Sequence, residues 1–210
     1  MHRLITLPAN GDRESLVFAA RRAGVVVTRP DTEADRLDMS AITFGGLDVV
    51  DVCRMPGAER GAIAAGIDGT IILFKDAFHD KQPGTIRYES IQGSVRRILS
   101  AGKYLFLLTS EGLYVIVGLV EHFLAGSEEN PFTPILVVPL RGSDANVVGD
   151  RWVLIVTPGG VLRLDIELLK QIKPPKDARD GFRPMRPIPI STTPRRRDVP
   201  QRSREVLAGV

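Results

Sequence analysis

Two apolar runs, one on each side of a four-residue turn, occur in the stretch Tyr104-Leu105-Phe106-Leu107-Leu108-Thr109-Ser110-Glu111-Gly112-Leu113-Tyr114-Val115-Ile116. Each run is too short for a stable helix and is rich in residues that strands favour. The turn ends on a glycine, which reaches positive φ at no steric cost. This stretch therefore predicts a β-hairpin with strands over 104–108 and 113–116.

The same module occurs four times in the first 170 residues. Its turns end on Gly24, Gly69, Gly112 and Gly160, which are 45, 43 and 48 residues apart. Self-similarity at a nearly constant period indicates a repeat architecture. The other three hairpins are predicted from Ser15–Ala20 with Val25–Val27, Gly61–Ala65 with Thr70–Phe74, and Trp152–Val156 with Val161–Leu164.

Further strands flank these hairpins. An innermost strand of each repeat is predicted at Arg3–Leu7, Val95–Leu99 and Ala145–Val148. An outermost strand is predicted at Leu47–Val52, Thr85–Glu89 and Ile135–Leu140. An edge strand tolerates the proline at position 139, because its backbone need not donate to a neighbour on both sides.

Four strands in about 45 residues resemble one blade of a β-propeller. The resemblance covers residues 1–169 and implies an all-β, propeller-like array of about four antiparallel blades, over 1–52, 53–90, 91–140 and 141–169. The signatures of WD40, kelch and quinoprotein repeats are absent, as is the glutamine-arginine box of the gyrase A pinwheel. The resemblance therefore indicates the class and no family within it. An all-β sandwich or barrel with chance spacing is the alternative.

The fourth repeat is incomplete. It ends near Leu169 after its third strand, because the prolines of Lys173-Pro174-Pro175-Lys176 cannot donate to a strand ladder. Open sheet edges are sites of pairing with another chain. Three arrangements remain open: a compact four-bladed ring, association with a second copy or another propeller half, and a chain that is part of a longer protein.

The basic residues are concentrated at the end of the chain. Residues 171–210 contain ten Lys/Arg and four Asp/Glu, whereas residues 1–170 contain 18 and 21. Seven of the 15 prolines lie in the same segment, so residues 170–210 are predicted to form a disordered basic tail. Its arginines are a candidate peptide ligand for a protein partner: Arg183, Arg186, Arg195, Arg196 and Arg197. The alternative is a solvated tail without a defined role. Binding of nucleic acid is the weaker hypothesis, because no aromatic platform accompanies the arginines.

No catalytic, metal or cofactor-binding motif stands out. His2, His79 and His122 are isolated from one another, and Cys53 is the single cysteine, which excludes an internal disulfide. We interpret His122 as a polar residue at the end of a strand and Cys53 as a packed thiol. The N-terminus lacks the apolar run of a secretory signal, and the most apolar stretch, 104–120, is interrupted by a polar turn. These features predict a cytoplasmic chain without a membrane span.

A repeat platform without a catalytic constellation favours a non-catalytic scaffold for protein–protein interaction, with no cofactor. The partner is expected to be another protein, a second propeller half or a second copy of the chain. The alternative is an enzyme or ligand-binding subunit with a small-molecule or metal site on the propeller axis. Turns that follow the innermost strands would build such a site, at Ala101-Gly102-Lys103 and Val148-Gly149-Asp150.

Overall fold

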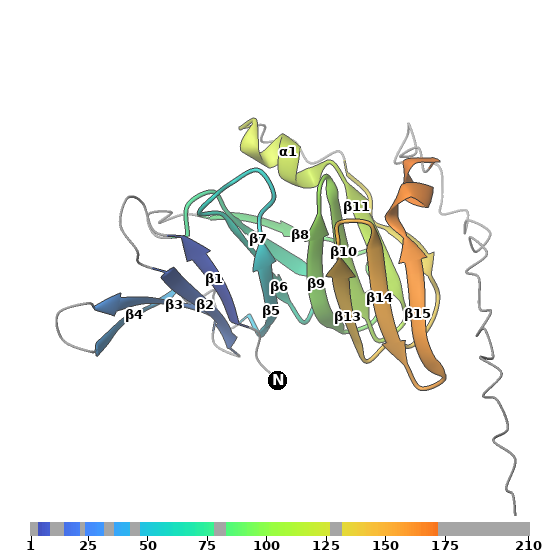
Figure 1. The fold of residues 1–210 in the computed structure, drawn as a ribbon, viewed down its shortest axis with the longest axis horizontal. Helices are drawn as coiled ribbons and strands as arrows, with labels where there is room; N and C mark the ends of the chain where they lie inside the picture. The colour runs from blue at the N-terminus through green and yellow to red at the C-terminus, as the bar shows by residue number, and fades with distance from the viewer. Residues whose placement is uncertain are drawn as a thin grey trace, which may run out of the picture.

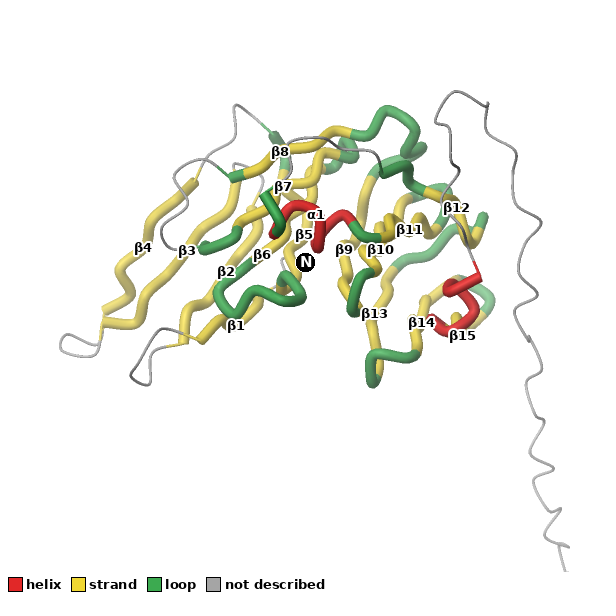
Figure 2. Tube along the Cα trace, turned by 90° about the horizontal axis from the view of Figure 1, so that it is seen from above, coloured by secondary structure: helices red, strands yellow, loops and turns green. Residues whose placement is uncertain are grey.

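The computed structural model describes residues 4–8, 15–21, 24–31, 36–42, 47–77, 83–126 and 132–171. Over these residues the chain forms antiparallel sheets with very little helix, so the all-β prediction is confirmed. Four sheets stand side by side in chain order, and the first and fourth lie at opposite ends of the array (Figures 1 and 2). Residues 172–210 of the predicted tail, with its five arginines, lie outside the described residues, as do His2 and His79. The prediction of disorder is wrong for the first two residues of that tail, Lys170 and Gln171, which belong to a 3-10 helix.

Each sheet is a simple meander, in which strands that follow one another in the sequence pair. The first sheet contains β1 (Leu4–Pro8), β2 (Ser15–Arg21), β3 (Gly24–Asp31) and β4 (Arg36–Ile42). The second contains β5 (Val49–Arg54), β6 (Ala62–Gly66), β7 (Thr70–Phe74) and β8 (Gly84–Arg87). The third contains β9 (Val95–Ala101), β10 (Tyr104–Thr109), β11 (Leu113–Val117) and β12 (Ile135–Val138). The fourth contains β13 (Asp144–Val148), β14 (Trp152–Thr157) and β15 (Gly160–Asp165).

The four predicted hairpins form, but their glycines serve two different purposes. Gly69 and Gly160 have φ of +88° and +128°, as a tight turn requires. Gly112 is absent from the positive-φ glycines. A Cβ there would collide with the carbonyl oxygen of Val138 and lie 2.6 Å from Leu136 Cδ1, so close approach of β12 demands the glycine. The expectation of positive φ is wrong at this turn.

The predicted position of the 47–52 strand is wrong. It was expected to be the outermost strand of the first repeat, but β5 is the first strand of the second sheet. The boundary predicted between residues 52 and 53 consequently falls inside β5. The last strand of the first sheet is β4, which pairs with β3 over seven positions. The sequence analysis did not predict this strand, because Arg36, Asp38 and Ser40 interrupt its apolar residues and leave no continuous apolar run.

The core lies between the sheets. Side chains of β6 and β7, such as Ile63 and Leu73, pack against Leu105 and Leu107 of β10. The opposite face of β10 presents Phe106 and Leu108 to the fourth sheet. Every side chain of β6, β7 and β10 is buried, because these strands have a sheet against both faces. Burial on both faces explains why the apolar runs are continuous and do not alternate.

In the part of the chain that the structure describes, two short helical segments accompany the sheets. The helix α1 (Leu119–Leu124) connects β11 to the segment before β12, and the 3-10 helix η1 (Ile166–Gln171) follows β15. The interpretation of His122 as a strand-end residue is wrong, because it lies in α1, where its ring stacks edge-on against Phe132 at 5.1 Å. In the described part of the chain, no helix has the length and apolarity that a membrane crossing requires.

Candidate functional site

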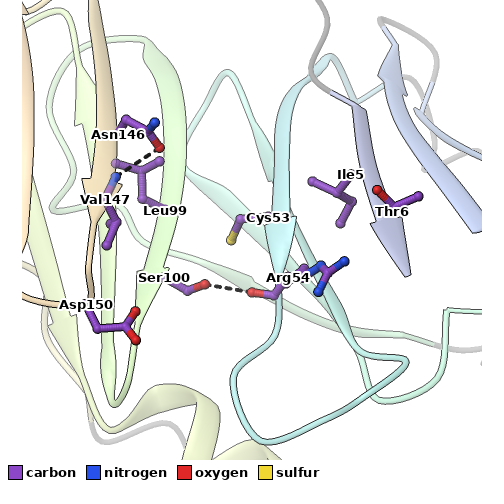
Figure 3. Close-up of a pocket in the computed structure, with 9 residues that line it drawn as sticks. All are labelled: Ile5, Thr6, Cys53, Arg54, Leu99, Ser100, Asn146, Val147 and Asp150. Atoms are coloured by element: carbon purple, nitrogen blue, oxygen red, sulfur yellow. Dashed lines mark hydrogen bonds between the residues drawn. The ribbon is translucent and has the colours of Figure 1, made fainter. Parts of the chain in front are cut away.

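A pocket lies where the first strands of the four sheets come together. β1 contacts β5, β5 contacts β9, and β9 contacts β13. The pocket has a volume of about 360 Å³ and takes a pair of adjacent residues from each of these strands, with Asp150 added from the turn after β13 (Figure 3). The pairs are Ile5 and Thr6, Cys53 and Arg54, Leu99 and Ser100, and Asn146 and Val147.

Two polar side chains that line this pocket form hydrogen bonds with the backbone. Ser100 Oγ donates to the carbonyl oxygen of Arg54 at 2.7 Å, and Asn146 Oδ1 accepts from the amide of Val147 at 3.0 Å. Cys53 is buried, as predicted. Arg54 is exposed, and Asp150 lies on the opposite side of the pocket (Figure 3). The lining therefore contains one cationic side chain, Arg54, and one carboxylate, Asp150. These two groups lie on opposite sides of the pocket and do not form an acid–base pair (Figure 3).

The two turns that were predicted to build a site on the propeller axis, 101–103 and 148–150, contribute unequally to this pocket. Asp150 lines the pocket and has φ of +51°, while Gly102 and Lys103 are not among the lining residues. Lys103 lies over the ring of Tyr104, with its Nζ 5.6 Å from the ring centroid. Within the described ranges, no three His, Cys, Asp or Glu side chains are placed to hold a metal ion.

A charged network joins three successive first strands beside the pocket. Asp51 of β5 is fully buried, and its Oδ2 accepts from the amide of Ile98 at 3.0 Å. Arg97 of β9 has its Nη1 3.5 Å from Asp51 Oδ1, while its Nε donates to Asp144 of β13. The hydrogen bond to Asp144 and the charges of both carboxylates raise the pKa of Arg97, although burial opposes the shift. One guanidinium therefore connects the second, third and fourth sheets.

The outward side of the fourth sheet carries a partly exposed apolar surface. The strand registers align Val148 with Trp152, and Val156 with Val161, on one face. Val148, Val156 and Val161 are 45%, 42% and 63% exposed. We call this surface the outer face of the fourth sheet and define it by Val148, Trp152, Leu154, Val156, Val161 and Arg163.

Trp152, at the start of β14, is the aromatic residue of the outer face. The guanidinium carbons of Arg151 and Arg163 lie 4.7 and 4.1 Å from its ring centroid. Arg151 also forms a salt bridge of 3.3 Å with Asp165. Tryptophan and arginine are the residues that most often dominate the energy of protein interfaces, in part because a guanidinium stacks well on an aromatic ring.

The equivalent face of the third sheet is covered. Tyr104, Phe106 and Leu108 occupy on β10 the positions that Trp152, Leu154 and Val156 occupy on β14. All three are buried against the fourth sheet. No element in the described ranges covers the fourth sheet in the same way, since its exposed valines belong to none of the packed clusters.

Sequence reasoning missed the outer face and the charged network. Asp51, Arg97 and Asp144 each precede a pocket-lining pair by two residues, and this recurrence was the available signal. It becomes meaningful only once the three strands are known to be neighbours, because charged residues are common at strand ends.

No family model matches the chain, and no curated protein matches it. Among solved structures, the chain is similar to PorZ, described as an essential bacterial surface component of the type-IX secretion system of Porphyromonas gingivalis. The identity is 19% and the TM-score 0.47. The match covers 77% of this chain and 19% of that one, so the chain spans about a fifth of PorZ.

Proposed function

We propose that this chain is a non-catalytic scaffold of β-propeller blades whose function is to bind a protein partner. The observation that carries the proposal is the outer face of the fourth sheet, where three exposed valines share a face with Trp152, whose ring is in contact with the guanidinium groups of Arg151 and Arg163. A contiguous apolar surface with a polar rim is typical of a protein-binding site. The predicted cytoplasmic location and the role of the basic tail stay predictions.

The platform is suited to this role because the sheets behind the outer face are rigidly packed. Val153 and Ile155 alternate with the outer-face residues along β14 and are fully buried against the third sheet. The network around Arg97 then connects the fourth sheet to the second. A preformed surface binds with a smaller loss of conformational entropy than a flexible one.

The second candidate function is binding of a small molecule in the pocket between the first strands. The observation in its favour is that all four sheets contribute to one pocket of about 360 Å³, within the size range of ligand sites. Arg54 is the one basic side chain in its lining, so an anionic compound is the expected ligand. Arg54→Ala would abolish such binding and leave protein binding unchanged.

The test is recovery of the chain from its own source under gentle conditions, with mass spectrometry of whatever remains bound. The native chain is compared with Val161→Glu, which places a charge at the most exposed position of the outer face. Ile67→Glu is the matched control, since Ile67 is 40% exposed in the β6–β7 turn of the second sheet and is not part of the outer face.

We expect the native chain and Ile67→Glu to retain a stoichiometric protein partner, whether a second copy or a different protein. Val161→Glu should lose it. Recovery of all three as single chains, with no bound protein, would contradict the scaffold function.

A further inference from the structure

We propose that the partner of the outer face is a second copy of this chain, and that two copies close a ring of eight sheets. In this ring the outer face of the fourth sheet packs against the first sheet of the other copy. The proposal rests on the proposed scaffold function and names the protein that the scaffold binds. Three independent features of the chain support it.

The first feature is the repeated mode of packing. In the first three sheets, one face of each sheet packs on the sheet that follows: Leu7 faces the second sheet, Cys53 the third and Leu99 the fourth. The outer face of the fourth sheet is equivalent to these packed faces, because Asn146 has on β13 the position that Leu99 has on β9. Val148 points to the same side as Asn146. In this mode of packing, the outer face would contact the opposite face of a further sheet, the one that faces the preceding sheet.

The second feature is that the first sheet offers such a side. Leu7 is buried against the second sheet, and its neighbour Thr6 is exposed. Adjacent residues of a strand point to opposite faces. The first sheet thus turns Thr6 away from the second sheet, toward the direction in which a preceding sheet would lie.

The third feature is the alternation of charge along the first strands. The residue two positions before each pocket-lining pair is Asp51 in β5, Arg97 in β9 and Asp144 in β13, and each neighbouring pair attracts. The order of charge across the second, third and fourth sheets is therefore Asp, Arg, Asp. A sheet that continued this alternation on the outer face would bring a cation to Asp144.

The size of the ring agrees with known architecture. Two copies of four sheets make eight, and propellers typically have four to eight blades. Two-fold symmetry makes both junctions between the copies identical, so the ring closes and no growing end remains.

The test is the mass of the purified full chain in solution by light scattering, over a range of concentrations. We expect 46 kDa, twice the 23.0 kDa of one chain. Val161→Glu and Thr6→Glu, which change opposite sides of the proposed junction, should each shift the mass to 23 kDa. The control Ile67→Glu should remain at 46 kDa. Circular dichroism of each variant verifies that it is folded.

Mixing the two monomeric variants sharpens the test. In a mixed ring both substitutions fall on one junction, and the other junction is entirely native. Mixing should therefore restore a 46 kDa species, whereas neither variant forms it alone. An association of two fourth sheets with each other would be insensitive to Thr6→Glu, and that result would overturn the proposal.

Three further outcomes overturn the proposal. A native chain of 23 kDa at all concentrations excludes the second copy. If only the chain shortened to residues 1–171 dimerises, the removed segment is the occupant of the outer face in the full chain. If the native chain is monomeric when pure but retains a different protein through Val161, the scaffold function stands and the second copy does not.

Discussion

Arg97 is the residue on which the arrangement of three sheets depends most. It is 16% exposed and faces Asp51, a carboxylate with no exposure at all. A buried ion pair contributes little relative to an apolar replacement, but removal of one partner leaves a charge without compensation. The network is thus a specific connection between strands, and its loss is expected to be costly.

Arg97→Ala should therefore lower the free energy of unfolding by about 3 kcal/mol, because it removes the guanidinium that lies 3.5 Å from the buried Asp51 carboxylate. Urea denaturation measures the loss. Arg87→Ala is the control, since Arg87 is 65% exposed where it faces Asp68 and should cost less than about 1 kcal/mol. The double variant Arg97→Ala with Asp51→Ala should lose less than the sum of its single variants. Equal effects of Arg97→Ala and Arg87→Ala would refute this role.

Among the elements, the pairing of β11 with β12 depends on a glycine for reasons of space. The turn before β11 is held by Thr109, whose Oγ1 accepts from the amides of Glu111 and Gly112 at 3.1 Å. The chain then passes directly against the backbone of Val138 in β12. The third sheet keeps its fourth strand only if position 112 has no side chain.

Gly112→Ala should destabilise the protein by about 2 kcal/mol, because the new methyl group meets backbone that cannot move aside without breaking the β11–β12 pairing. Thermal unfolding and hydrogen exchange of the amides in β12 are the measurements. Gly159→Ala is the matched control, since the nearest atom to its Cβ would be Thr157 Oγ1 at 3.9 Å. A loss of stability as large for Gly159→Ala would show that the close approach is not the cause.

At the scale of the whole molecule, the decisive feature is an array of four sheets whose two end faces differ. The fourth sheet presents an apolar outer face. The first sheet, in which Thr6 is exposed, lies at the opposite end of the array (Figure 1). In the proposed ring these two ends meet, so that stability and assembly are linked.

The proposed ring therefore predicts that the Tm depends on protein concentration. A tenfold increase adds about 1.4 kcal/mol to the stability of a dimer and should raise the Tm by about 2 °C. Scanning calorimetry at several concentrations measures this. Val161→Glu should have a lower Tm that is independent of concentration. A native Tm that does not change with concentration would be incompatible with a dimeric ring.

The sequence by itself determined the all-β class and the four hairpins. These follow from local chemistry: turn residues such as Gly69 and apolar runs such as Tyr104–Leu108 act on their own stretch of chain. Only the tertiary structure decided that β5 begins the second sheet, that Arg97 joins Asp51 to Asp144, and that the outer face is uncovered among the described residues. The physical reason is distance along the chain, since Arg97 and Asp144 are 47 residues apart. Contacts of that separation depend on how sheets stack, which no local pattern encodes.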